Sequence, residues 1–154
     1  MTTMTSSYAP SSLPDPATQA EFYEGVPFKR FVAWIVDAII ITAISAMAIP
    51  FTAFTAIFYF PLLMLIVGFI YRWGTIASRS STWGMRLMAI ELRDMRGNRL
   101  SSGDAFAHTA GYTASVIMAP AQLISMLLMA VTPKGQGLSD HLLGTTAINR
   151  PAWT

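Results

Sequence analysis

Apolar residues in this chain are gathered into long blocks, and the first block covers residues 31–71. Apart from tyrosine hydroxyls, Asp37 is its only ionisable side chain. As a helix rising about 1.5 Å per residue, the block would be ~60 Å long, roughly twice the ~30 Å hydrocarbon core of a bilayer. One helix of a soluble core does not explain that length. The pattern therefore predicts two membrane spans, at about 31–49 and 51–71, interrupted by Pro50.

The connection between the two predicted spans is short and uncharged, which favours a tight antiparallel hairpin. Pro61 falls inside the second predicted helix, where its missing backbone donor predicts a kink that neighbouring helices can tolerate in a membrane. Tyr71 and Trp73 beside Arg72 are typical of the anchors that hold a helix end at the membrane interface.

A third apolar block at residues 105–131 has His108 and the Tyr112 hydroxyl as its only ionisable groups. A straight helix of that length, ~40 Å, is generous for one span and short for two. Pro120 leaves two forms open. One long kinked span would place the C-terminus outside, whereas a re-entrant hairpin would bring the C-terminus back. We favour the re-entrant form.

The polar segments predict which side of the membrane each part faces. Residues 1–27 are rich in Pro, Ser and Thr and are interpreted as a disordered tail, and residues 28–150 form the membrane domain. The loop at 72–104 holds six arginines against three acidic residues, and Lys29 and Arg30 lie at the same end of the hairpin. By the positive-inside rule, the N-terminus and this loop are cytoplasmic.

Within that loop, the loosely alternating residues 87–93 and the turn residues after them predict a short strand or β-turn at the surface. Residues 101–104 supply N-cap side chains for the next helix. The predicted fold class is an all-α helical integral membrane protein. It has an N-terminal transmembrane hairpin, an arginine-rich cytoplasmic loop and a third block that is kinked or re-entrant at Pro120.

Composition excludes several function classes. Charged residues make up 12% of the 154 residues, about half the level of a soluble domain. The net charge of +2 is too small to indicate nucleic acid, so the lipid bilayer is the expected partner of the basic residues. With no cysteine and two histidines, no metal site or cofactor is predicted. Ser139, Asp140 and His141 are adjacent and cannot form a catalytic triad. No catalytic residue is assigned, and no enzyme activity is expected.

Asp37 is the first candidate for a polar site. It lies about two helical turns beyond Arg30 on the same helix face, at a depth where a carboxylate costs roughly 2.5–3.5 kcal/mol to insert. Such a residue faces a partner, a cavity or the protein interior. Two interpretations stay open: a cation or proton site, or a packing lock in which Asp37 is bonded to polar groups such as Thr42, His108 or Thr109.

Arg30 and Asp140 are the second candidate pair. Arg30 either snorkels to lipid headgroups or pairs with Asp140, and that pairing requires the re-entrant form of the third block. His108, near the start of the block, is more typical of a hydrogen-bonding interfacial residue than of a metal ligand.

Four short motifs cover nearly all of the chain after the tail, in this order: Phe28-Lys29-Arg30-Phe31-Val32-Ala33-Trp34-Ile35-Val36-Asp37, Ser81-Thr82-Trp83-Gly84-Met85-Arg86-Leu87-Met88-Ala89-Ile90, Gly97-Asn98-Arg99-Leu100-Ser101, and Gly135-Gln136-Gly137-Leu138-Ser139-Asp140-His141-Leu142-Leu143-Gly144-Thr145. Together they resemble the RDD family of small bacterial membrane proteins, named for an arginine and two aspartates. The resemblance implies that Arg30, Asp37 and Asp140 are the signature positions. It also implies a multi-pass protein of the bacterial cytoplasmic (inner) membrane.

Three positions depart from the family pattern. Met85 stands where the family often has a lysine, and His108 stands where it often has an arginine. The family commonly shows His-Asp near the end, whereas here Ser139 precedes the aspartate. Arg86 and His108 are the residues expected to support the signature positions.

The family is generally described as uncharacterised with suspected transport roles, and two functions remain as alternatives. One is transport or ion handling that uses Asp37 in a polar intramembrane seam. So few helical segments can hardly enclose a pathway alone, which implies a homo-oligomer. The other is a non-transporting scaffold or accessory subunit whose 72–104 loop binds a membrane protein partner or anionic lipid.

Overall fold

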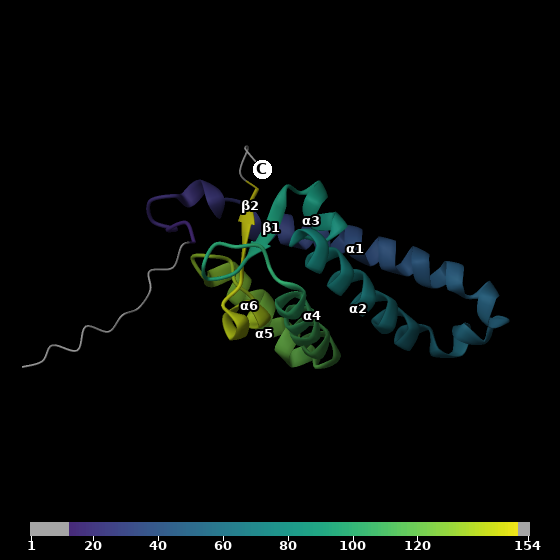
Figure 1. Ribbon diagram of the computed structural model, residues 1–154. Helices are drawn as coiled ribbons and strands as arrows, with labels where there is room; N and C mark the ends of the chain where they lie inside the picture. The colour runs from purple at the N-terminus through teal and green to yellow at the C-terminus, as the bar shows by residue number, and fades with distance from the viewer. Residues whose placement is uncertain (1–12, 151–154) are drawn as a thin grey trace, which may run out of the picture.

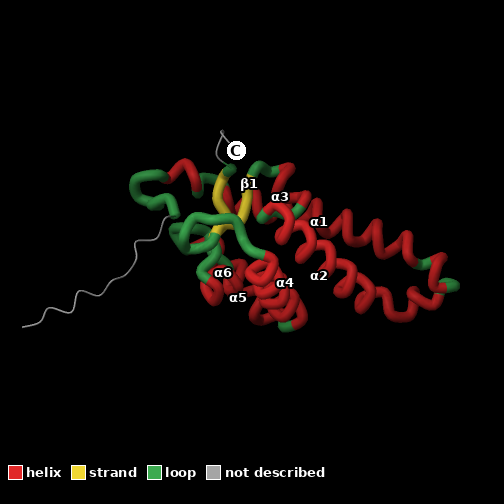
Figure 2. Tube along the Cα trace, viewed as in Figure 1, coloured by secondary structure: helices red, strands yellow, loops and turns green. Residues whose placement is uncertain are grey.

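A long helical hairpin projects from a cluster of short elements (Figure 1). The computed structural model describes residues 13–150. The hairpin consists of α1 (Val26–Ala48) and α2 (Phe60–Arg79). The cluster at its open end contains α3 (Trp83–Leu87), β1 (Ile90–Arg93), α4 (Ser102–Ile117), α5 (Ala119–Val131), α6 (Leu138–Leu143) and β2 (Thr146–Asn149). Figure 2 shows that most loops also gather at this end.

The first helix buries one stripe and exposes apolar side chains on its other faces. Inside the hairpin, its buried positions recur at four-residue spacing, at Ala33, Asp37, Ile41 and Ser45. Large apolar side chains elsewhere on the helix are exposed, including Ile39 at 64%. Lipid accommodates a surface of this kind, whereas water does not. By length and composition α1 and α2 can each cross a membrane, and the α4–α5 pair would be a third span if it is counted as one.

The tip of the hairpin is a compact turn region rather than a single proline break. Two 3-10 turns, at Pro50–Thr52 and Thr55–Tyr59, carry the chain around. Between them, Ala53 and Phe54 both adopt positive φ, at 52° and 64°. The chain reverses direction at these left-handed residues. The turn region therefore includes the residues with which the predicted second span begins.

The second span therefore differs from the predicted 51–71. α2 begins at Phe60 and continues to Arg79. Pro61 falls in its first turn, where a backbone donor is not needed, so it does not kink the helix. Arg72 lies inside α2, and the arginine-rich segment that connects the hairpin to α4 begins at residue 80 rather than 72.

The short helix α3 lies across the open end of the hairpin. Its N-cap is Thr82, whose hydroxyl accepts a hydrogen bond from the Met85 backbone N–H at 3.2 Å. Gly84 packs directly against α1: a Cβ added there would lie 2.2 Å from the Ala33 carbonyl oxygen and 2.8 Å from Asp37 Oδ1. Only a glycine permits this approach of two helices.

A two-stranded antiparallel sheet joins segments that are far apart in the sequence. β1 lies within the segment predicted as a strand or turn, and it pairs with β2 so that Ile90 faces Asn149 and Arg93 faces Thr146. No strand at 146–149 is predicted from the sequence. The small sheet thus adds to an otherwise helical fold and holds the end of the described chain beside the hairpin.

The third apolar block forms two helices rather than one. α4 begins with the expected N-cap, Ser101, which forms a capping box with Asp104 through side-chain and backbone hydrogen bonds. The chain then bends by 117° between α4 and α5. The break lies at Met118, and Pro120 occupies the first turn of α5, where it cannot donate to a preceding turn.

The described part of the predicted tail is folded. Tyr23 is 7% exposed, and its hydroxyl donates to the Pro14 carbonyl at 2.7 Å. Burial of this ring and of Val26, the first residue of α1, holds residues 13–27 against the cluster, in contrast to the predicted disorder. Residues 1–12 of the predicted tail lie outside the described residues.

Replacement of Gly84 by alanine is expected to destabilise the protein by about 1–3 kcal/mol, because the new methyl group collides with α1 backbone. Gly74→Ala is the matched control, since a Cβ at Gly74 meets nothing within 4 Å. Thermal unfolding in detergent, followed by tryptophan fluorescence, measures both variants. Equal midpoints for Gly84→Ala and the wild type would show that α3 does not dock on α1 in this way.

Candidate functional site

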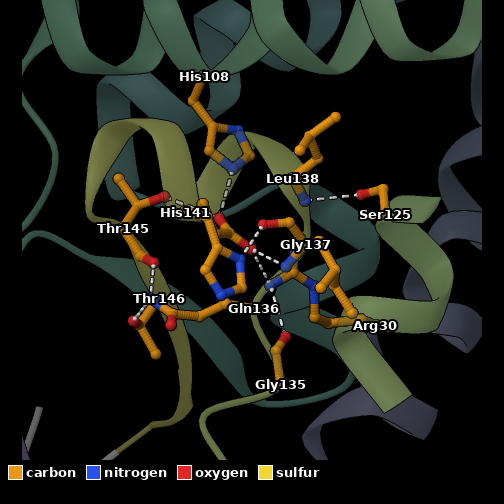
Figure 3. Close-up of polar contacts among 12 residues, drawn as sticks. Arg30, His108, Ser125, Gly135, Gln136, Gly137, Leu138, His141, Thr145 and Thr146 are labelled. Carbon is orange, nitrogen blue, oxygen red and sulfur yellow. Dashed lines mark hydrogen bonds and ion pairs between the residues drawn. The ribbon is translucent and has the colours of Figure 1, made fainter. Parts of the chain in front are cut away.

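Asp140 lies at the centre of a buried polar cluster, which we call the Asp140 site. Arg30 Nη1 donates to Asp140 Oδ2 at 2.6 Å, and the Gly137 backbone N–H donates to the same oxygen at 3.0 Å. His108 Nε2 lies 3.0 Å from Oδ1, and the Thr145 hydroxyl donates to Oδ1 at 2.7 Å. Figure 3 shows Arg30, His108 and Thr145 approaching from different elements.

Local structure explains how Asp140 is held. It is the third residue of α6, and its carboxylate accepts from the N-cap residue Gly137 as in a capping box. The side chain is therefore fixed by its own helix before α1 and α4 supply Arg30 and His108. The aspartate is fully buried, so hydrogen-bond donors of the protein replace the water that would hydrate an exposed carboxylate.

The electrostatics of the Asp140 site favour the ionised carboxylate. Burial by itself raises the pKa of Asp140, but the Arg30 guanidinium and the His108 and Thr145 hydrogen bonds act in the opposite direction. The balance holds the pKa of Asp140 well below its usual range. Arg30 and Asp140 thus form a charged pair at the open end of the hairpin.

Asp37 forms a second and separate cluster, the Asp37 site. Its Oδ1 accepts from the Tyr71 hydroxyl at 2.8 Å and from the Gly84 backbone N–H at 2.9 Å. Its Oδ2 accepts from the Thr82 hydroxyl at 2.7 Å and lies 3.6 Å from Arg72 Nη1. The carboxylate therefore joins α1 to α2 and to the N-terminus of α3.

Arg72 also connects the Asp37 site to α4. Its guanidinium carbon lies 4.2 Å from the centre of the Tyr112 ring. At this distance the positive charge is attracted to the face of the aromatic ring. The Tyr112 hydroxyl in turn accepts from Trp34 Nε1 at 2.8 Å. Side chains from α1, α2 and α4 thus hold one another at the depth of Asp37.

The chemistry of both sites is that of satisfied carboxylates. Each aspartate is surrounded by donors and lies beside a guanidinium, so no free carboxylate oxygen is presented for catalysis or for a cation. Within residues 13–150, no group of three His, Asp or Glu side chains is arranged to hold a metal ion. The geometry is suited to fixing helices relative to one another.

The structure brings three of the predicted residues together and leaves two apart. Arg30, Asp140 and His108 meet in one cluster. Asp37 is in the other cluster, and its partners are not the proposed ones: Thr42 bonds the carbonyl of Ala38 in its own helix, and His108 bonds Asp140. Thr109, the third proposed partner, has a buried hydroxyl with no hydrogen-bond partner among the described residues.

Arg86 lies outside both clusters. Its Nη2 reaches the Ser81 carbonyl at 3.4 Å, and its Nε is buried without a hydrogen-bond partner among the described residues.

None of the partners of Asp37 was predicted from the sequence. Tyr71 is predicted to be an interfacial anchor beside Arg72, although Asp37 and Tyr71 lie equally far along the chain from Phe54, at the hairpin tip. In an antiparallel hairpin this symmetry places them at one depth, and it could have identified the pair. Thr82 and Gly84 carried no comparable signal, because their contact depends on how α3 turns back on α1.

The fold and these two clusters define a small multi-pass helical membrane protein with internally paired charges. The sequence matches the RDD family over residues 25–144, which is most of the chain, and the protein belongs to that family. No curated protein and no solved structure matches the chain.

Replacement of Asp140 by asparagine is expected to destabilise the protein by about 3–5 kcal/mol near neutral pH, because Arg30 would lose its buried counter-charge. The folded-state pKa of Asp140 lies below its unfolded value of about 3.9. The stabilisation by the charged form is therefore complete above that value and is lost as the pH falls below it. Unfolding in detergent should show the gap between wild type and Asp140→Asn narrowing below about pH 4.

Asp104→Asn is the matched control for this titration, since Asp104 is an exposed capping residue. It should shift the unfolding midpoint only slightly. A gap between wild type and Asp140→Asn that stays constant down to pH 2 would contradict a charged Asp140 in the folded state.

Proposed function

We propose that this RDD-family protein is a non-enzymatic, non-transporting scaffold or accessory subunit of the bacterial cytoplasmic membrane. Its hairpin anchors a small cytoplasmic face, and residues 80–101 of that face bind a protein partner or anionic lipid. One observation carries the proposal: Asp37, the acid deepest in the apolar hairpin, is occupied by three hydrogen-bond donors and lies beside the Arg72 guanidinium.

A cation site has different requirements. Cations bind where several oxygens present lone pairs. Around Asp37, by contrast, the Tyr71 and Thr82 hydroxyls donate hydrogen bonds to the carboxylate, and the Gly84 N–H has no lone pair to offer. The nearby Arg72 charge also opposes entry of a second cation. The arrangement therefore supports a structural lock.

The proposed orientation follows from charge at the open end of the hairpin. Lys29 and Arg30 begin α1, Arg79 ends α2, and Arg150 follows β2. The contact between Arg30 and Asp140 supports the re-entrant form of the α4–α5 block, since both residues then lie at one membrane surface. We assign the N-terminal segment, residues 80–101 and the end of β2 to the cytoplasm.

A membrane partner is also part of the proposal. An apolar groove runs along α1 over small side chains that include Ala38, Thr42 and Ala46. Small residues on a membrane helix permit close approach of another helix. The groove is suited to a helix of a partner protein or of a second copy of this chain.

Ion or proton handling is the second candidate. The Asp140 site favours it, because Arg30, His108 and Asp140 form a buried titratable group at the open end of the hairpin. His108 Nδ1 is buried and has no hydrogen-bond partner among residues 13–150. A proton entering there would act on the charge balance of the whole cluster.

For a scaffold, purified protein in proteoliposomes should carry no proton, Na⁺ or K⁺ flux above protein-free vesicles under any imposed gradient. Asp37→Asn should then differ from wild type in stability and not in flux, with Asp104→Asn as the control for loss of one carboxylate. Ion-sensitive dyes inside the vesicles provide the measurement. Flux by the wild type that disappears in a folded Asp37→Asn variant would establish ion handling instead.

The orientation predicts that tags at either end of the chain are protected from protease in intact spheroplasts and cleaved in inverted membrane vesicles. The Arg30–Asp140 contact brings the start of α1 and α6 to one surface, which is the physical basis of this expectation. Immunoblotting of both tags gives the answer. Cleavage of the C-terminal tag alone in spheroplasts would rule out the re-entrant form.

A further inference from the structure

Three arginines come close together beside the end of α2, and we call them the arginine cluster: Arg79, Arg86 and Arg150. Arg79 is the last residue of α2. Arg86 lies in α3 and reaches back to the Ser81 carbonyl, two residues after Arg79. The Arg150 backbone N–H donates to the Ala89 carbonyl at 2.8 Å, which places Arg150 beside the same short helix.

The charge of the arginine cluster is only partly balanced within the described residues, because its one ion pair is with a carboxylate that a fourth arginine also contacts. The fully buried Glu91 contacts Arg93 directly through one carboxylate oxygen. Arg150 Nε lies 4.0 Å from the other oxygen of Glu91, a distance too long for a hydrogen bond.

The donors of Arg86 are also largely free. Within residues 13–150, its one side-chain hydrogen bond is the long one to Ser81 at 3.4 Å, and its Nε has no partner. Partial burial and the neighbouring guanidiniums of Arg79 and Arg150 lower the pKa of Arg86. Like charges held together with unused donors are suited to an anion.

The proposed orientation puts the arginine cluster at the membrane interface. α3 packs on α1 at Ala33 and Asp37, which belong to the apolar length of the hairpin. Trp83 and Leu87 are 60% and 71% exposed and share one face of α3 by their spacing. An exposed tryptophan and leucine beside arginines are the side chains expected where acyl chains meet headgroups.

We propose that the arginine cluster binds the phosphate of an anionic phospholipid in the cytoplasmic leaflet, with Trp83 and Leu87 against the upper part of its acyl chains. This rests on the proposed membrane orientation and specifies the ligand of the cytoplasmic face. Guanidiniums bind phosphate oxygens through paired N–H donors. The adjacent apolar face of α3 selects a lipid over a free phosphate ion, which has no acyl chain to contact it.

The test uses the full chain in phosphatidylcholine vesicles that contain phosphatidylglycerol, with bromine atoms on the acyl chains of one lipid or the other. Bromine quenches nearby tryptophan, and the difference between wild type and Trp83→Phe isolates the Trp83 signal. We expect stronger quenching by brominated phosphatidylglycerol than by brominated phosphatidylcholine at equal proportion. In Arg79→Gln/Arg86→Gln this excess should be lost, with roughly 30-fold weaker binding, since each basic residue at an anionic surface contributes a factor of about five.

Arg96→Gln/Arg99→Gln is the matched control, because it removes the same charge from exposed residues outside the arginine cluster and should keep the excess quenching. Arg79→Gln alone, at the exposed end of α2, provides a variant with little risk to folding and should lose part of the excess.

Three results would overturn the proposal: equal quenching by both lipids, equal loss in the control pair, or loss of the excess on addition of inorganic phosphate at matched ionic strength. None of them depends on ion flux or on partner binding. Failure of the lipid site and failure of the scaffold function are therefore distinguishable.

Discussion

The ion pair between Arg30 and Asp140 closes the structure on itself. It joins residues 110 positions apart, and every other described element from α1 to α6 is arranged between them. The chain runs out along α1, returns along α2, crosses the mouth of the hairpin in α3 and β1, and goes out and back again through α4 and α5. Asp140 is fully buried. Burial of an ionised carboxylate is costly unless it has an opposite charge and several hydrogen-bond donors around it. The end of the described chain must therefore return to the start of α1.

This dependence on polar contacts follows from the size of the apolar core. The buried apolar cluster is confined to the mouth of the hairpin, and it is built largely from side chains such as Val26, Ala33, Ile76 and Ile90. Lipid provides no hydrophobic driving force between the outer parts of the two long helices. We infer that the Asp37 and Asp140 sites specify which helices meet and at what register, even where each ion pair adds little to net stability. The close contact of Gly84 with Ala33 acts in the same way, through shape instead of charge.

Much of the fold could be predicted from the sequence, because long apolar blocks have few interpretations in a protein. The hairpin, the family and the pairing of Arg30 with Asp140 came from block length, motif order and charge. The boundaries of α2 could not be predicted, since the hairpin tip depends on positive φ at Ala53 and Phe54, residues with no marked preference for it. Strand β2 and the partners of Asp37 were missed for a related reason. Both depend on contacts between segments distant in sequence, and short polar segments such as 80–84 carry no periodicity that reveals those contacts.

Asp37 and Asp140 differ in how much of the chain must be synthesised before each is present together with its partners. Tyr71, Thr82 and Gly84 follow Asp37 by 34, 45 and 47 residues, so the Asp37 site can form soon after the hairpin is inserted. Asp140 follows Arg30 by 110 residues, which at bacterial and eukaryotic synthesis rates corresponds to roughly 5–20 s of translation. During that interval Arg30 lacks Asp140 as its counter-charge, and its position in the first turns of α1 lets the side chain extend to the lipid headgroups. An arginine one or two turns deeper in the helix could not reach the headgroups. The depth of Arg30 is therefore constrained by biosynthesis as well as by the finished fold.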